Sequence, residues 1–162
     1  MHSNQYTLIY AAVLSVFTAV VLAVTAEGLR PAQEANVALD TKSNILRAVR
    51  LDLSDPSSIE STYDNQIEEL VVNAQGEVLA DVDIQRVALK DEIGKDATER
   101  KLPLYVFTAE DGKKRYIIPM RGVGLWGPIW GFVSLEEGFN TVYGATFDHK
   151  SETPGLGAEI SE

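Results

Sequence analysis

The chain opens with a long apolar run in which no side chain is charged. Residues 1–26 contain no Asp, Glu, Lys or Arg, and the 21 residues from Tyr6 to Ala26 are interrupted only by Ser and Thr. At about 1.5 Å of rise per residue, a helix of this length crosses the roughly 30 Å hydrocarbon core of a bilayer. Hydroxyl side chains are tolerated there because they bond back to their own helix. We therefore predict a tail over residues 1–5 and a single transmembrane helix over residues 6–26.

Two other interpretations of this segment compete with a retained anchor. A cleaved signal peptide would carry Lys or Arg near its start and a shorter apolar region, although Val24-Thr25-Ala26 resembles a cleavage site. A buried helix of a globular domain would rarely remain uncharged over such a length. The anchor is therefore favoured, and its flanking charges hardly indicate an orientation.

Helical spacing of apolar residues returns after a polar stretch. Arg30-Pro31 is expected to end any continuous helix, which leaves a connector over residues 27–39. Asp40 is then predicted to cap a helix that extends to about Leu51. Asp55-Pro56, a cap followed by proline, predicts the start of a second helix. Packing in a core explains the apolar positions of both helices.

Short apolar runs separated by turn residues dominate the rest of the chain. They predict strands over residues 70–72, 77–79, 104–107, 116–119, 124–135 and 141–147. Turns at Asn73–Gly76 and Asp111–Gly112 would join neighbouring runs into hairpins. The charged segment 86–100 is expected to be a loop. The sequence thus predicts an α+β fold, in which residues 40–162 form one domain with a mostly antiparallel sheet and flanking helices.

Composition excludes several classes of function. The chain has 14 Lys and Arg against 24 Asp and Glu, a formal net charge of −10, which argues against binding nucleic acid. It has no cysteine, and its two histidines, His2 and His149, lie at opposite ends of the sequence. Disulfides, thiolate nucleophiles and metal sites built from Cys or His are therefore not expected.

Glycines cluster with aromatic residues in the C-terminal third. The stretch Gly122–Val133 holds four glycines among its residues, together with both tryptophans. Glycines in a strand mark bulges or the close approach of another group, and two tryptophans can wall a planar ligand. Farther on, the Gly-X-Gly of residues 155–157 could form a turn whose amides bind an anion. From composition and spacing alone, a twisted strand over an apolar core and an ordinary loop are the favoured explanations of the two stretches.

At these motifs the sequence resembles a known family. The apolar N-terminal segment, the Gly-Leu-Trp strand, Phe132–Leu135 and the segment Thr141–Gly157 with its Glu-Thr-Pro-Gly-Leu-Gly are similar to the C subunit of the sodium-translocating NADH:quinone oxidoreductase. The G subunit of the Rnf electron-transport complex is related, but it matches the Gly-Leu-Trp region less closely. The resemblance extends over nearly the whole chain.

The resemblance implies a flavoprotein that relays electrons within a membrane complex and is not catalytic alone. FMN would be attached through its phosphate to a threonine, in a domain that faces the periplasm from a bacterial inner membrane. The partners would be the bilayer and the other subunits of the complex, which conduct the sodium. The cofactor-binding residues would be Leu125, Trp126, Gly127, Glu152, Thr153, Gly155, Leu156 and Gly157, with no catalytic residue and no metal ligand. The flavin itself would perform the redox chemistry.

The sequence departs from the family pattern in two ways. Gly127-Pro128 follows the tryptophan where relatives have hydroxyl residues, and Pro128 has no amide hydrogen to donate. The resemblance also places the attachment threonine in a C-terminal segment that this sequence lacks, which suggests truncation and leaves positions around Trp130 and Phe147 open. Tyr143-Gly144-Ala145-Thr146 contains part of the attachment motif, but Tyr143 stands where the motif has Ser or Thr. We predict that Thr146 is an outward strand residue and not the attachment site.

Two alternatives of a different class remain at this point. The chain could be a membrane-anchored assembly or scaffolding protein that keeps the fold without flavin. It could also be a periplasmic module whose loop holds another anion. Flavin absorption by the purified chain would separate the redox protein from both.

Overall fold

A long N-terminal helix begins the part of the chain that the computed structural model describes, residues 4–161. This helix, α1, extends from Asn4 to Ala48, and the chain up to Ala38 forms a compact unit of its own. Its N-terminal part is long and apolar enough to cross a membrane, and none of that stretch is buried by protein. Thr18 and Thr25 donate their hydroxyl hydrogens to the carbonyls of Leu14 and Val21, at 2.9 and 2.8 Å, so these side chains are satisfied within the helix.

Residues 27–39 are helical, so the predicted connector and the new helix start at Asp40 are both wrong. Pro31 lies inside α1. Proline removes one backbone donor and crowds one carbonyl in the preceding turn, but the turns on either side can keep their own hydrogen bonds. Arg30 pairs with Glu27 and with Glu34, each at 3.2 Å, which stabilises the helix across the proline.

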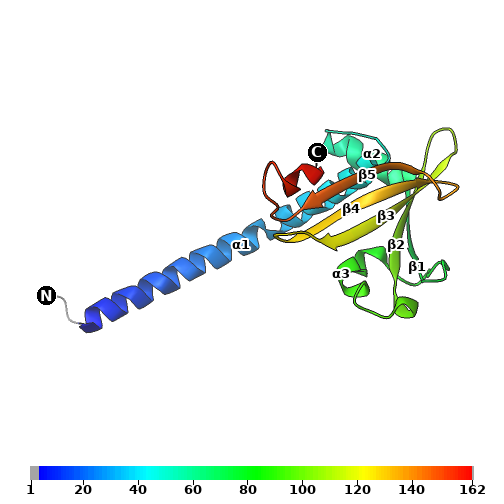
Figure 1. Ribbon diagram of the computed structural model, residues 1–162. Helices are drawn as coiled ribbons and strands as arrows, with labels where there is room; N and C mark the ends of the chain where they lie inside the picture. Colours follow the sequence, from blue (N-terminus) through cyan, green and yellow to red (C-terminus); the bar gives the residue numbers. More distant parts are fainter. Residues whose placement is uncertain (1–3, 162) are drawn as a thin grey trace. The chain divides into compact units, whose positions relative to one another are not determined.

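The second compact unit begins at Leu39 and is built on a five-stranded antiparallel sheet (Figure 1). Neighbouring strands in the sheet are also neighbours in the sequence. The strands are β1 (Ile67–Val72), β2 (Leu102–Thr108), β3 (Lys114–Val123), β4 (Pro128–Glu136) and β5 (Val142–His149). This sheet, with an apolar N-terminal helix and further helices, confirms the predicted α+β class.

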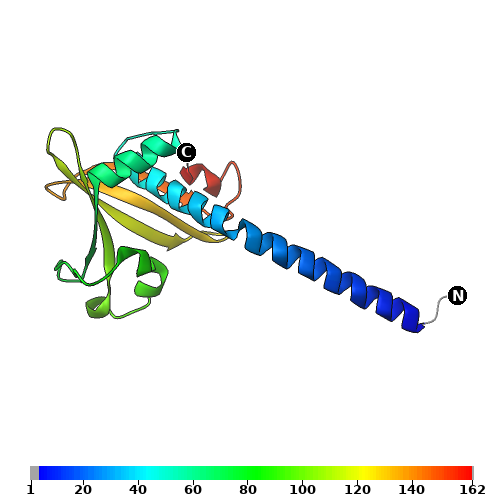
Figure 2. The same ribbon diagram turned by 180° about the vertical axis from the view of Figure 1, so that it is seen from behind.

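The last turns of α1 and the helix α2 (Pro56–Gln66) cover one face of the sheet (Figure 2). As predicted, Asp55 caps α2, and its side chain accepts a hydrogen bond from the Ser58 amide at 3.0 Å. Lys42 pairs with Asp64 at 3.0 Å and joins the two helices. The core between helices and sheet consists of Ile45, Leu46, Ala48, Val49, Ile59, Tyr63, Phe107, Ile117 and Phe132.

Close approach of α1 to β5 depends on Gly144. A Cβ atom at this position would overlap with the carbonyl oxygen of Ala48. The neighbouring Thr146 does not point outward as predicted, since its hydroxyl donates to the Asn44 carbonyl at 3.1 Å. The wrong prediction arose because a loose strand pattern does not reveal which face a helix will cover.

The segment between β1 and β2 differs from the predicted hairpin and loop. β1 pairs with β2, and residues 77–79 contribute only an isolated bridge between Val72 and Val78. Short helices then follow, namely η1 (Ile84–Arg86), α3 (Leu89–Glu92) and η2 (Ala97–Glu99). Glu92 is buried there because it accepts from the Lys101 amide at 3.0 Å and pairs with Lys95 at 2.7 Å.

Candidate functional site

A tight turn joins β3 to β4 and displays two large apolar side chains. Within residues 124–127, the Gly124 amide donates to the Gly127 carbonyl at 2.7 Å. Leu125 and Trp126 at its tip are 83% and 65% exposed. The predicted strand over residues 124–135 therefore begins only at Pro128, because the glycine-rich residues before it reverse the chain.

The loop after β5 satisfies much of its own backbone. Leu156 and Ala158 donate their amide hydrogens to the Thr153 carbonyl at 3.1 and 3.2 Å, and the Gly155 amide donates to Glu159 Oε1 at 2.9 Å. Gly155 has a φ of 73°, a conformation that glycine adopts without strain. Within the Gly-X-Gly of residues 155–157, the amides of Gly155 and Leu156 thus already have acceptors and are not free to bind an anion. The loop ends in the short helix η3 (Gly157–Ser161).

Hydrogen bonds tie the turn to this loop through the backbone of Trp126. Glu152 Oε1 accepts from the Trp126 amide at 3.0 Å, and Ser151 Oγ donates to the Trp126 carbonyl at 2.9 Å. The Lys150 amide also donates to the Pro128 carbonyl at 3.1 Å. We name the segments 124–127 and 149–157, joined in this way, the turn–loop junction.

All eight residues predicted to bind a cofactor lie in the turn–loop junction. Leu125, Trp126 and Gly127 belong to the turn, whereas Glu152, Thr153, Gly155, Leu156 and Gly157 belong to the loop. Trp126 and Glu152 are in direct contact. Leu156 is 74% exposed, so it adds a third apolar side chain to the outer surface of this junction.

Three further residues organise the junction and were not singled out from the sequence. Ser151 binds the Trp126 carbonyl, and His149 Nδ1 accepts a hydrogen bond from the Glu152 amide at 3.1 Å. Gly124 leaves the room that the Glu152 carboxylate fills. Their positions beside predicted residues were the only signal, since these contacts depend on the pairing of β4 with β5.

The positions around Trp130 and Phe147 are half-buried, where we expected them to be open. With Met120, Gly122 and Ile129 they line a small hollow of about 150 Å³ on β3, β4 and β5. Met120 is 48% exposed at its edge. This hollow is smaller than those that usually enclose drug-sized ligands, which occupy about 300–1,000 Å³.

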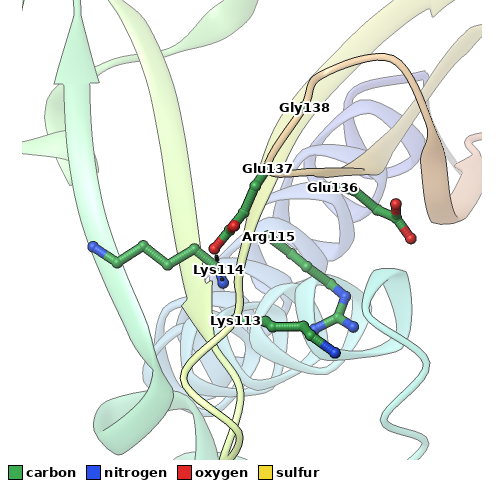
Figure 3. Close-up of a pocket in the computed structure, with 6 residues that line it drawn as sticks. All are labelled: Lys113, Lys114, Arg115, Glu136, Glu137 and Gly138. Atoms are coloured by element: carbon green, nitrogen blue, oxygen red, sulfur yellow. Dashed lines mark hydrogen bonds between the residues drawn. The ribbon is translucent and has the colours of Figure 1, made fainter.

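A second hollow, of about 280 Å³, has a charged lining (Figure 3). It is formed by Lys113, Lys114, Arg115, Glu136, Glu137 and Gly138. Glu137 Oε1 accepts from the Lys114 amide at 2.9 Å, and the Arg115 guanidinium lies over the Tyr143 ring at 3.8 Å. Charges of both signs surround this space, so it offers little apolar surface to a planar ring.

Metal ligands do not gather in the described part of the chain. Within residues 4–161, no group of three or more His, Asp or Glu side chains lies close enough to hold a metal ion.

Comparison with known proteins places these features in a family. The chain is 30% identical to the C subunit of Na(+)-translocating NADH-quinone reductase of Pseudomonas aeruginosa, over 98% of this chain and 68% of that protein. It is 33% identical to the protein of the same name from Neisseria meningitidis serogroup B, over 95% of this chain. The chain belongs to the family of Na(+)-translocating NADH-quinone reductase C subunits. It spans 66% of the length of the Neisseria relative.

Solved structures from this C-subunit family have the same fold. The crystal structure of the protein from Parabacteroides distasonis is 40% identical and superposes with a TM-score of 0.71, over 83% of this chain and 64% of that chain. The structure from Shewanella oneidensis is 25% identical, with a TM-score of 0.61, over 76% of this chain and 64% of that chain. In addition, residues 124–161 match the model of the FMN-binding domain family, and this range contains the whole turn–loop junction.

Proposed function

We propose that this chain is a membrane-anchored flavoprotein that relays electrons through FMN within a sodium-pumping NADH:quinone reductase. The observation that carries the proposal is the coincidence of two results. The FMN-binding match begins at the β3–β4 turn and ends after the loop, and these two segments are joined by hydrogen bonds through Trp126. A scaffolding protein without flavin and an Rnf-type protein are less favoured, because the Neisseria and Pseudomonas relatives are C subunits of the reductase.

The side chains of the junction suit the ring of a flavin better than its phosphate. Leu125, Trp126 and Leu156 expose apolar surface on which a planar ring can lie. Gly127, Thr153, Gly155 and Gly157 would contribute backbone and small side-chain contacts along the ring and its ribityl chain. FMN would supply reversible electron transfer, and the protein would bind and orient the flavin.

Three backbone amides of the loop are not available to a phosphate. The amides of Gly155, Leu156 and Ala158 already donate to partners within the loop. We therefore expect the phosphate of FMN to contribute little to binding at this junction, and the ring to contribute most.

Thr146 is a poor candidate for covalent attachment of FMN. Its hydroxyl faces α1 and donates to the Asn44 carbonyl at 3.1 Å, so a phosphodiester at this oxygen would displace the helix. We propose that attachment through a threonine, which the family resemblance implies, does not use Thr146.

The apolar part of α1 supports anchoring in a membrane. We propose that it crosses a bacterial inner membrane once, that the domain built on the sheet faces the periplasm, and that the remaining subunits of the complex are its partners. Mass spectrometry of the chain extracted from membranes should then show an N-terminus that has not been cleaved within residues 1–26.

The test of flavin binding is a titration of the purified full chain in detergent with FMN, followed by flavin fluorescence and visible absorption. FMN should bind to the wild type, and it should bind more weakly to Leu125→Ala and Leu156→Ala, because each substitution removes exposed apolar surface from the junction. Val142→Ala is the matched control, since Val142 is 59% exposed on β5 outside the junction. Equal binding by all three variants would contradict this site, and a wild type without any flavin spectrum or binding would favour the scaffolding alternative.

A further inference from the structure

The Glu152 carboxylate lies between the two segments of the turn–loop junction. Its Oε1 atom accepts from the Trp126 amide at 3.0 Å. A Cβ atom on Gly124 would overlap with this same oxygen, and a Cβ atom on Gly157 would lie 2.8 Å from Oε2. Both contacts would be closer than those that real Cβ atoms make. The carboxylate therefore occupies space that exists only because both positions are glycine.

This arrangement gives the two glycines a role inside the protein. The sequence predicts Gly157 as one of the cofactor-binding residues. In the structure, the room beside Gly157 and Gly124 is filled by Glu152. The glycines therefore admit the side chain that joins the turn to the loop.

Both polar groups of the Trp126 backbone are held by the segment that follows β5. Glu152 accepts from its amide, and Ser151 donates to its carbonyl at 2.9 Å. Glu152 is itself fixed, because its own amide donates to His149 Nδ1 at 3.1 Å. The indole nevertheless remains 65% exposed. Its backbone is thus anchored while its ring is available for contact.

We propose that Glu152 is a positioning residue, which fixes the Trp126 turn against the loop and thereby presents the indole at a defined place and orientation. The inference deepens the proposed function and rests on it only for the identity of the ligand, FMN. Glu152 acts through Trp126, since its Oε1 atom is engaged by the Trp126 amide.

The first experiment measures the mobility of Trp126 in the full chain in detergent. In a Trp130→Phe background, Trp126 is the single tryptophan, so its fluorescence anisotropy and acrylamide quenching report on the turn. Glu152→Ala should lower the anisotropy and increase quenching. Glu152→Gln keeps an oxygen that can accept from the Trp126 amide, and it should restore most of the wild-type signal. Glu159→Ala is the control, because Glu159 accepts from Gly155 in the same loop and does not hydrogen-bond to the turn.

The second experiment tests the fit between Glu152 and the glycines with a double-mutant cycle. Gly124→Ala should shift the unfolding midpoint more in the wild type than in the Glu152→Ala background, where the overlapping carboxylate is gone. Gly127→Ala is the matched control. A Cβ atom on Gly127 would meet Ser151 Oγ at 2.9 Å and not the Glu152 carboxylate, so its effect should depend on Glu152 less than that of Gly124→Ala does.

FMN titration connects the positioning role to the ligand. Loss of the hydrogen bond in Glu152→Ala should weaken FMN binding roughly tenfold, with recovery in Glu152→Gln. If the wild type binds no FMN but the anisotropy of Trp126 falls in Glu152→Ala, the proposed function is contradicted and the positioning role is supported. Two results together would overturn the positioning role, whether or not FMN binds. These are an unchanged anisotropy in Glu152→Ala, and additive effects of Gly124→Ala and Glu152→Ala on the unfolding midpoint.

Discussion

The helix-covered face of the sheet and the turn–loop junction are held together by different forces. On the helix-covered face, Ile45, Leu46 and Ile117 are fully buried, and the contacts are almost entirely apolar. At the junction, Leu125 and Trp126 are exposed to solvent, and polar contacts through Glu152 and Ser151 hold the turn in place. Burial is not directional and is shared among many residues, whereas a hydrogen bond fixes one geometry between two groups.

This difference separates stability from recognition. Changes on the helix-covered face should alter the free energy of unfolding and leave the order of Trp126 unchanged. Truncation of the exposed side chains at the junction should do the reverse. Chemical unfolding of the full chain in detergent measures the first kind of effect, and the fluorescence of Trp126 in the Trp130→Phe background measures the second.

Leu46→Ala should have the largest effect. Leu46 has no exposed surface in the core between α1 and the sheet, and truncating such a residue lowers the free energy of unfolding by about 2–5 kcal/mol. Leu125→Ala, a change of the same type at an 83% exposed position, should alter it by no more than about 0.5 kcal/mol. Equal losses in the two variants would contradict the division between the regions.

Gly144→Ala should come next, because its Cβ atom would overlap with the Ala48 carbonyl oxygen and force α1 away from β5. The expected loss of stability is about 1–3 kcal/mol, typical of overpacking. Gly138→Ala is the control, since a Cβ atom there would meet no atom within 4 Å. Denaturant titration of both variants measures the difference in the free energy of unfolding. Equal losses would show that α1 can move away from β5 at little energetic cost.

Glu92→Gln tests a carboxylate that accepts a hydrogen bond from a backbone amide, as Glu152 does, but that is buried. The amide of Lys101 and the ammonium group of Lys95 hold the pKa of Glu92 below its usual 4.5. Because the pKa is lowered in the folded state, this contribution to stability is fully present above about pH 4.5 and is lost as the pH falls through the folded value. The melting temperature of Glu92→Gln should therefore fall less than that of the wild type on acidification below about pH 4.5. Glu99→Gln, on exposed η2, should follow the wild type, and parallel curves for all three chains would refute the prediction.

Ser134→Ala should have the smallest effect and the opposite sign. Ser134 is fully buried in β4, and its hydroxyl has no hydrogen-bond partner in the described part of the chain. Removing a buried unsatisfied hydroxyl should leave the free energy of unfolding unchanged or raise it by up to about 1 kcal/mol. A clear loss of stability would indicate that the hydroxyl is bonded, for example to a buried water molecule.

Features that depend on neighbours along the chain could be predicted from local patterns of residues. Asp55 before Pro56 predicted the cap of α2, and runs rich in β-branched and aromatic residues predicted β2 and β3. The Gly-Leu-Trp strand and the Glu-Thr-Pro-Gly-Leu-Gly segment indicated the family. Capping and strand propensity act over a few residues, so a local pattern is sufficient to predict them.

Contacts between distant segments could not be predicted in this way, because they depend on how the sheet and the helices pack. β1 pairs with β2, 30 or more residues later in the chain, and places Ile67 opposite Phe107, which is buried under the helices. Helix α1 continues through Pro31, which a local rule would not allow. The contact between Glu152 and Trp126 joins residues 26 positions apart. It requires the register that places His149 opposite Ile129, a consequence of the long β4–β5 hairpin. A carboxylate and two glycines can be identified in the sequence, but the space they share exists only once the sheet has aligned them.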